Sequence, residues 1–151
     1  MRYLFEFFTN KVLISGLAGW LIAQIVKLFV NLATTRKFDL KRLWGDGGMP
    51  SGHSSMVLGV ATSSLLLYGI ASYQFAIAAV IAIIVTHDAT GVRRESGRHA
   101  KALNELMELV TDQEISDEDK LKEFLGHTHL QVIVGGIMGI LIALFICKVI
   151  H

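Results

Sequence analysis

The stretch MVLGVATSSLLLYGIASYQFAIAAVIAIIVT, residues 56–86, contains no charged side chain. Such a run is typical of a membrane-spanning chain, because ionised side chains are costly in hydrocarbon. The run is too long for one ordinary span of about 20 residues. We divide it near residues 71–74 into spans over 56–71 and 74–90. Each half is short for a span, so one long helix stays open as an alternative.

Two further apolar segments lie on either side of this run. They cover 12–35 and 130–150, and each is long enough to cross a hydrocarbon core of about 30 Å. Of the 151 residues, 18% are charged, fewer than the about 25% of soluble domains. We therefore predict an all-α fold: a single membrane-embedded domain over 1–151, which is a polytopic helical bundle with about four transmembrane helices.

Lysine and arginine gather on one side of the predicted bundle. The loops over 36–53 and 91–126 carry ten of them, and the opposite side carries three. The positive-inside rule places the ten-charge side in the cytoplasm, and we expect an integral protein of a bacterial plasma membrane. A net charge of +1 gives no overall basicity to attract nucleic acid.

The second of these loops contains a helical pattern of apolar residues. The spacing i, i+3, i+4, i+7 predicts a cytoplasmic amphipathic helix over about 96–111, which lies on the bundle or at the membrane interface. A second short helix is expected over 116–126, because Ser116 suits its N-cap and Gly126 its end. The apolar positions of the first helix are Leu103, Leu106, Met107 and Val110.

Three polar side chains interrupt the first predicted span. Gln24, Lys27 and Asn31 follow at spacings of three and four, which places them on one helix face. A lysine inside a span usually faces the bundle interior, although Lys27 lies close enough to the helix end to reach the interface instead. We expect Lys27 to bind substrate, and Gln24 and Asn31 to form hydrogen bonds between helices.

The stretch GGMPSGHSS, residues 47–55, leads into the second predicted span. Backbone N–H groups at a glycine-containing helix start can bind an anion. Ser51 and Gly52 are therefore candidates for substrate binding, and His53 is a candidate for catalysis. The alternative is a plain turn that happens to contain a histidine.

A polar cluster follows the third predicted span. Asp88 lies at the end of the apolar run, and Arg93 and Arg94 come shortly after it. Adjacent arginines suit phosphate, because guanidinium groups bind its oxygens in pairs, although they can also contact lipid headgroups. Asp88 either pairs with an arginine or holds a catalytic histidine.

The fourth predicted span begins with LGHTHLQVIVGG, residues 125–136. His127 and Gln131 are four residues apart and share a helix face. No metal site is predicted, because no H-E-x-x-H or Cys/His ligand set is present. Gly135 and Gly139 form a GxxxG pattern, which we interpret as packing inside the bundle rather than between copies.

The polar groups of all these segments are predicted at the same membrane face. Two histidines and several cations around one anion are typical of phosphoryl transfer by covalent catalysis. One imidazole attacks phosphorus, and the other protonates the leaving oxygen. Cations neutralise the charge on the phosphoryl oxygens, so no metal or other cofactor is expected.

Three stretches carry a resemblance to a known family: GGMPSGHSS (47–55), HDATGVRRESGRHAKALNEL (87–106) and LGHTHLQVIVGG (125–136). With them the chain resembles the type 2 phosphatidic acid phosphatase superfamily, which includes the vanadium haloperoxidases. It is most similar to the divergent branch of acid phosphatase/vanadium-dependent haloperoxidase-related membrane proteins. The resemblance to that branch covers nearly the whole chain, and the link to the superfamily rests on PSGH and GH…QVxxG.

The resemblance implies roles for four residues. Ser51 and Gly52 match the positions that cradle phosphate, and His53 matches the general acid of PSGH. His127 matches the nucleophile of the superfamily motif SR-x5-H-x3-D.

The chain also departs from the superfamily pattern. Leu121 stands at the arginine position of that motif, and Gln131 stands at its aspartate. The K-x6-RP motif is absent, because Pro50 is the only proline. We expect the missing roles to be filled by Lys27, Asp88, Arg93 and Arg94.

The leading interpretation is a metal-independent phosphoric monoester hydrolase that acts on lipids at the cytoplasmic face through a phosphohistidine. Its substrate is expected to be a lipid with a terminal phosphate, such as phosphatidylglycerol phosphate, phosphatidate or a polyprenyl phosphate. The other partners expected are membrane lipids, without nucleic acid, and homo-oligomerisation is left open. Two alternatives remain: a non-catalytic binder or transporter of phosphorylated lipid, and a structural membrane subunit.

Overall fold

The computed structural model describes residues 1–36, 48–111, 116, 120–121 and 126–149. All regular secondary structure in these ranges is α-helical. The helices are α1 (Arg2–Thr9), α2 (Lys11–Thr35), α3 (Gly52–Tyr68), α4 (Tyr73–Thr90), α5 (Val92–Thr111) and α6 (His129–Val149). The prediction of an all-α fold is confirmed.

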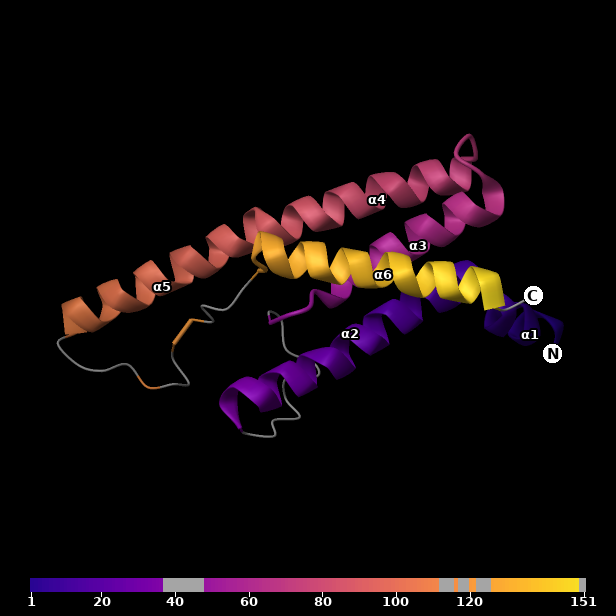
Figure 1. Ribbon diagram of the computed structural model, residues 1–151. Coiled ribbons are helices and arrows are strands. Elements are labelled where there is room, and N and C mark those ends of the chain that lie inside the picture. The colour runs from indigo at the N-terminus through magenta and orange to yellow at the C-terminus, as the bar shows by residue number, and fades with distance from the viewer. Residues whose placement is uncertain (37–47, 112–115, 117–119, 122–125, 150–151) are drawn as a thin grey trace.

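Four of the helices, α2, α3, α4 and α6, form an elongated bundle (Figure 1). α3 is its centre and packs against each of the other three. α2 and α4 run antiparallel to α3, whereas α6 runs parallel to it. One end of the bundle therefore carries the last turns of α2 and α4 and the first turns of α3 and α6. We call it the Pro50 end, after the buried residue that precedes α3.

The uncharged run over 56–86 folds as two helices, so the alternative of one long helix is wrong. α3 ends before Gly69, whose φ of +82° is accessible to glycine at little cost. α4 then starts with Ser72 as its N-cap, and the Ser72 side chain accepts a hydrogen bond of 3.2 Å from the Phe75 N–H. The break lies two residues before the position that the sequence predicts.

The helices have the length and composition of a membrane protein. Three apolar segments among the described residues are long enough to cross a bilayer: Lys11–Thr35, Tyr73–Thr111 and His129–Val149. The helix α3 has 17 residues, which is near the lower limit of about 17 for a span. A fourth crossing by α3 stays a prediction.

Small residues allow the helices of the bundle to approach closely. The Ser55 hydroxyl of α3 donates a 2.9 Å hydrogen bond to the Gly19 carbonyl of α2. A Cβ atom at Gly139 of α6 would collide with the Ser55 carbonyl oxygen, and one at Gly135 would collide with that of Ser51. The GxxxG pattern thus packs α6 against α3 within one chain, as predicted.

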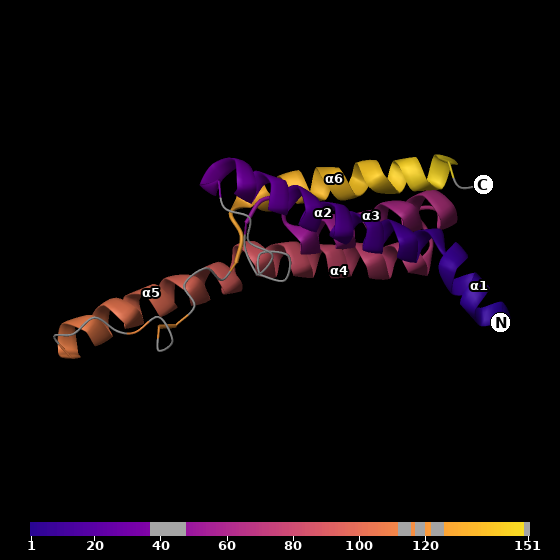
Figure 2. The ribbon, with the colours of Figure 1, turned by 90° about the horizontal axis from the view of Figure 1, so that it is seen from below.

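The helix α5 continues from α4 and extends beyond the Pro50 end (Figures 1 and 2). Its buried residues are Gly97, Ala100 and Asn104. Asn104 exchanges two hydrogen bonds with the Leu121 backbone, at 2.9 and 3.0 Å. The predicted helix is therefore present.

The predicted apolar face of α5 is exposed and does not lie on the bundle. Position at the membrane interface stays a prediction. The short helix expected over 116–126 falls mostly outside the described residues.

Candidate functional site

The best-defined part of the candidate site is the start of α6. Thr128 is the N-cap residue, and Gln131 is the third residue of the helix. The Gln131 N–H donates to the Thr128 hydroxyl at 3.3 Å, and the Thr128 N–H donates to Gln131 Oε1 at 3.0 Å. This reciprocal pair is a capping box. The T-x-x-Q pattern over 128–131 is the sequence signal of this cap, and the sequence analysis did not include it.

His127 lies directly before this cap and is only 6% exposed. Its Nδ1 lies 3.2 Å from Gln131 Oε1, and its backbone N–H donates to the Ala89 carbonyl of α4 at 2.9 Å. His127 is therefore fixed in place by contacts with both α4 and α6. Gln131 is the partner of His127, as the spacing of four residues predicts.

The hydrogen bonds of Gln131 decide which nitrogen of His127 carries the proton. The Thr128 N–H needs an acceptor, so the amide oxygen, and not the NH₂ group, must face it. The same oxygen faces Nδ1 of His127, which can make this hydrogen bond only by donating. In the neutral ring the other nitrogen, Nε2, then carries a lone pair and no proton. That is the state that a nucleophilic histidine requires.

Ser51 connects α3 to this arrangement through its backbone. The Ser51 N–H donates to the Gln131 carbonyl at 3.0 Å. The Ser51 hydroxyl caps α3 by accepting from the Ser54 N–H at 3.3 Å, and the residue is 0% exposed. These contacts give Ser51 a positioning role between α3 and α6, and its contact with phosphate stays a prediction.

The first turn of α3 contributes two more predicted residues, Gly52 and His53. Their N–H groups belong to the first turn of the helix, where no intrahelical acceptor exists. Gly52 is buried, and a Cβ atom there would lie 3.3 Å from Trp20 Cδ1, so packing alone explains the glycine. The His53 side chain is exposed and makes no hydrogen bond to any described residue. No described contact joins it to His127.

Asp88 pairs with an arginine rather than with a histidine. Arg93 Nε donates to Asp88 Oδ2 at 2.7 Å, and both side chains are partly exposed. This is the structural alternative that the sequence analysis left open for Asp88. Arg94 is half-buried, and its backbone packs under Gly126, where an added Cβ atom would lie 2.5 Å from the Arg94 nitrogen.

Lys27 faces the interior of the protein, as predicted, and is 6% exposed. It lines a cavity of about 140 Å³ together with Asn31 and Gly48. Gln24, one turn earlier, is 8% exposed, and its Oε1 atom has no hydrogen-bond partner in the described structure. The helix–helix hydrogen bond expected of Gln24 is therefore not made. A buried polar atom left without a partner costs about 1–3 kcal/mol.

Two further histidines lie at the same end of the bundle. His87 of α4 and His129 of α6 line a second cavity of about 350 Å³, together with Thr90. The sequence analysis gave neither histidine a role, because nothing in the spacing shows that the end of α4 meets the start of α6. Among the described residues, no three His, Cys, Asp or Glu side chains form a cluster that could hold a metal ion.

Comparison with known proteins places this geometry in context. The family model described as "Divergent PAP2 family" matches residues 8–142. The chain is also 37% identical over 150 residues to "Uncharacterized membrane protein YuiD" of Bacillus subtilis (strain 168), an alignment that covers 92% of this chain and 95% of that protein. No solved structure matches the chain.

Proposed function

Because the chain belongs to the Divergent PAP2 family, we propose that it is a membrane lipid phosphatase. It removes the terminal phosphate of a phosphorylated lipid through a phosphohistidine at His127, on the cytoplasmic side of the membrane. One observation carries this proposal. His127 is buried, and Gln131 Oε1, 3.2 Å from Nδ1, directs the proton of the imidazole to that nitrogen.

The proposed reaction has two steps. In the first, Nε2 of His127 attacks phosphorus, the bond from phosphorus to the lipid oxygen breaks, and His53 donates a proton to the leaving alcohol. In the second, His53 takes a proton from water, and the water oxygen displaces Nε2 to release inorganic phosphate. Gln131 orients the imidazole as a hydrogen-bond acceptor but brings no negative charge to stabilise an imidazolium.

Cationic groups at the Pro50 end support the binding of a phosphate. Lys27 is buried one turn from the unpartnered Gln24 oxygen, and a buried amide beside a cation suits a polar headgroup. Arg94 is half-buried next to the loop that precedes His127. Guanidinium and ammonium groups stabilise the charge that spreads over phosphoryl oxygens during transfer.

A phosphate-release assay tests the proposal directly. Purified protein in detergent micelles is expected to release phosphate from phosphatidate, phosphatidylglycerol phosphate or undecaprenyl phosphate without added metal. Orthovanadate is expected to inhibit it, because vanadate adopts the five-coordinate geometry of the transferring phosphoryl group. An absence of release from all three lipids would exclude the phosphatase, whereas tight vanadate binding without turnover would favour the non-catalytic lipid binder.

Substituting Gln131 tests how the imidazole is oriented. Gln131→Leu removes the acceptor of the Nδ1 proton and is expected to lower the rate of phosphate release by about 10²-fold. Gln131→Glu keeps an acceptor oxygen and adds a negative charge at a helix N-terminus, where it is favourable. We expect this variant to retain or exceed the wild-type rate.

Thr128→Ala is the matched control for the capping role of Gln131. It weakens the cap by about 1 kcal/mol but leaves the Gln131 oxygen beside His127. Its rate of phosphate release is expected to stay within about threefold of the wild-type rate, because the substitution lowers stability but does not change the orientation of His127. If Thr128→Ala and Gln131→Leu lowered the rate equally, Gln131 would act only through the helix cap.

A further inference from the structure

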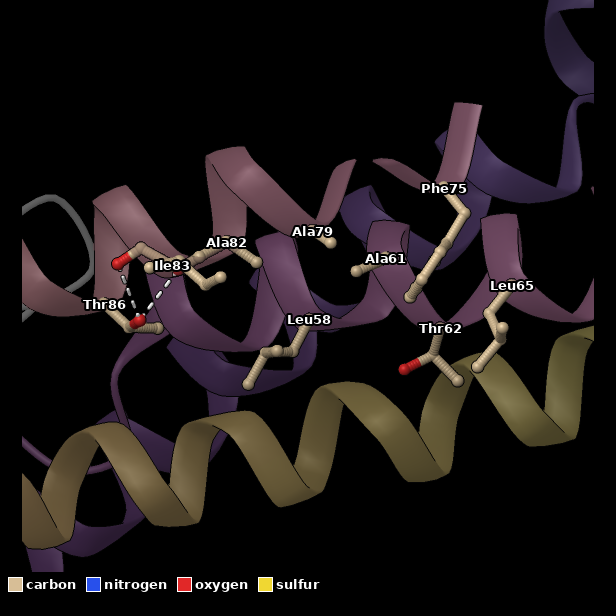
Figure 3. Close-up of a pocket in the computed structure, with 9 residues that line it drawn as sticks. All are labelled: Leu58, Ala61, Thr62, Leu65, Phe75, Ala79, Ala82, Ile83 and Thr86. Atoms are coloured by element: carbon tan, nitrogen blue, oxygen red, sulfur yellow. Dashed lines mark hydrogen bonds between the residues drawn. The ribbon is translucent and has the colours of Figure 1, made fainter. Parts of the chain in front are cut away.

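Two neighbouring cavities on the outer surface of the bundle share part of their lining, and we call the two together the groove. The first, of about 300 Å³, lies over α3 and is lined from α3 and α4 (Figure 3). The second is the cavity between the ends of α4 and α6 that contains His87 and His129. Ile83 and Thr86 line both cavities, so the two adjoin along α4. The groove exists because α3 packs against α4 and α6, while those two helices touch only sparsely.

The chemistry of the groove changes along its length. Away from the Pro50 end its walls are apolar except for Thr62, and Leu65 and Phe75 lie at its far end (Figure 3). The Thr86 hydroxyl donates back to the Ala82 carbonyl at 2.7 Å. At the Pro50 end the imidazoles of His87 and His129 join the lining, beside the apolar Val132 and Ile133. Two imidazoles at one end of a mostly apolar groove suit a molecule with an apolar chain and a polar head.

The apolar part of the groove follows most of α4. Phe75 and Thr86 mark it, and 11 helical steps of about 1.5 Å give roughly 16 Å. Phe75 lies in the first turn of α4 and Leu65 in the last turn of α3, so the groove runs from the Pro50 end to near the opposite end of the bundle.

The polar end of the groove adjoins the candidate nucleophile. His129 is the first residue of α6 and follows His127 by two positions. The Ala89 carbonyl that accepts from the His127 N–H belongs to the same last turn of α4 as His87. A headgroup at this end of the groove therefore lies at the helix junction that positions His127.

We propose that this groove holds one fatty acyl chain of the phosphorylated lipid, with the phosphate at the Pro50 end beside His87 and His129. The assignment rests on the proposed function for the nature of the headgroup, and phosphatidate is the lipid phosphate used to test it.

Photolabelling tests the groove without requiring turnover. The full-length protein is reconstituted in phosphatidylcholine vesicles with a phosphatidate probe that carries a diazirine near the end of one acyl chain. We expect label on the groove segments of α3 and α4, competed by unlabelled phosphatidate but not by additional phosphatidylcholine. Label spread evenly over the exposed residues Ile77 and Ile84 of α4 would show ordinary bilayer contact and overturn the proposal.

Two matched variants of α4 sharpen this test. Ala79 lines the groove, so Ala79→Phe is expected to fill it and to lower the competed labelling about tenfold, as for a filled apolar pocket. Ala76 is exposed and lies outside the groove lining, so Ala76→Phe is expected to leave labelling unchanged. Thr62→Phe narrows the groove from the α3 side. It replaces Ala79→Phe in the experiment if Ala79→Phe does not fold. Unchanged labelling in folded Ala79→Phe and Thr62→Phe would exclude the groove as the chain site.

Failure of the groove and failure of the phosphatase give different results. Groove-specific labelling in a protein that releases no phosphate would support the lipid site and exclude the enzyme. If Ala79→Phe changed neither the labelling nor the rate of phosphate release from phosphatidate, the groove would be excluded as the chain site. The proposed phosphatase activity would still be supported.

Discussion

His127→Ala is expected to abolish phosphate release, with a loss on the order of 10⁴-fold or more. The substitution removes the only atom that the proposed mechanism uses to bond phosphorus. The local fold should survive, because the hydrogen bond from residue 127 to the Ala89 carbonyl uses the backbone N–H. The measurement is the initial rate of phosphate release from phosphatidate, with thermal unfolding in the same detergent to verify that the protein is folded.

His99→Ala is the matched control for this experiment. His99 is an exposed histidine on α5, far from the start of α6 in the sequence, and its loss is expected to leave the rate unchanged. Wild-type protein that is quenched in mid-turnover with ³²P-labelled substrate should carry acid-labile phosphate, and His127→Ala should carry none. Full activity of His127→Ala would refute the assignment of the nucleophile.

Gly139→Ala is expected to produce a large loss of stability. The new Cβ atom would meet the Ser55 carbonyl oxygen, with its carbon at 2.8 Å and its Cα at 2.9 Å. These are backbone atoms of α3 and cannot rotate away, so the two helices must separate. Overpacking of this kind costs about 1–3 kcal/mol, occasionally more. The unfolding temperature in detergent measures the effect.

Gly136→Ala provides the comparison within the same helix. There the added Cβ atom meets the end of the Leu58 side chain, which can adopt another rotamer. The cost of that adjustment is offset by the helix propensity of alanine, about 0.5–1 kcal/mol better than glycine. We expect Gly136→Ala to unfold near the wild-type temperature. Equal losses for the two variants would mean that contact with the α3 backbone does not limit the approach of α6.

Much of the fold could be predicted from hydropathy alone. Spans predicted over 12–35, 74–90 and 130–150 agree with α2, α4 and α6 to within a few residues. The break between α3 and α4 was placed slightly late, because hydropathy does not change there, whereas Gly69 ends α3 and Ser72 caps α4. The exposure of the apolar face of α5 could not be predicted. Periodicity shows that the helix has an apolar face, but it does not show whether another part of the protein covers that face.

The candidate site was predictable only where its residues are close in sequence. The pairing of His127 with Gln131 follows from helical spacing, and so does the shared face of Gln24 and Lys27. The Asp88–Arg93 pair was one of two open alternatives, and no local pattern could choose between them. The burial of Ser51 could not be predicted, because Ser51 packs against α6, which lies far away along the chain.

The bond between the Ser51 N–H and the Gln131 carbonyl has a consequence for the order of assembly. The described hydrogen bonds of His127 come from α6 and from the end of α4, and α6 follows the other helices of the bundle in the sequence. Until α6 docks, α2 can already pack against the first turn of α3, but the Ser51 N–H and the Gln131 carbonyl have not yet met. The candidate site is thus completed when α6 docks.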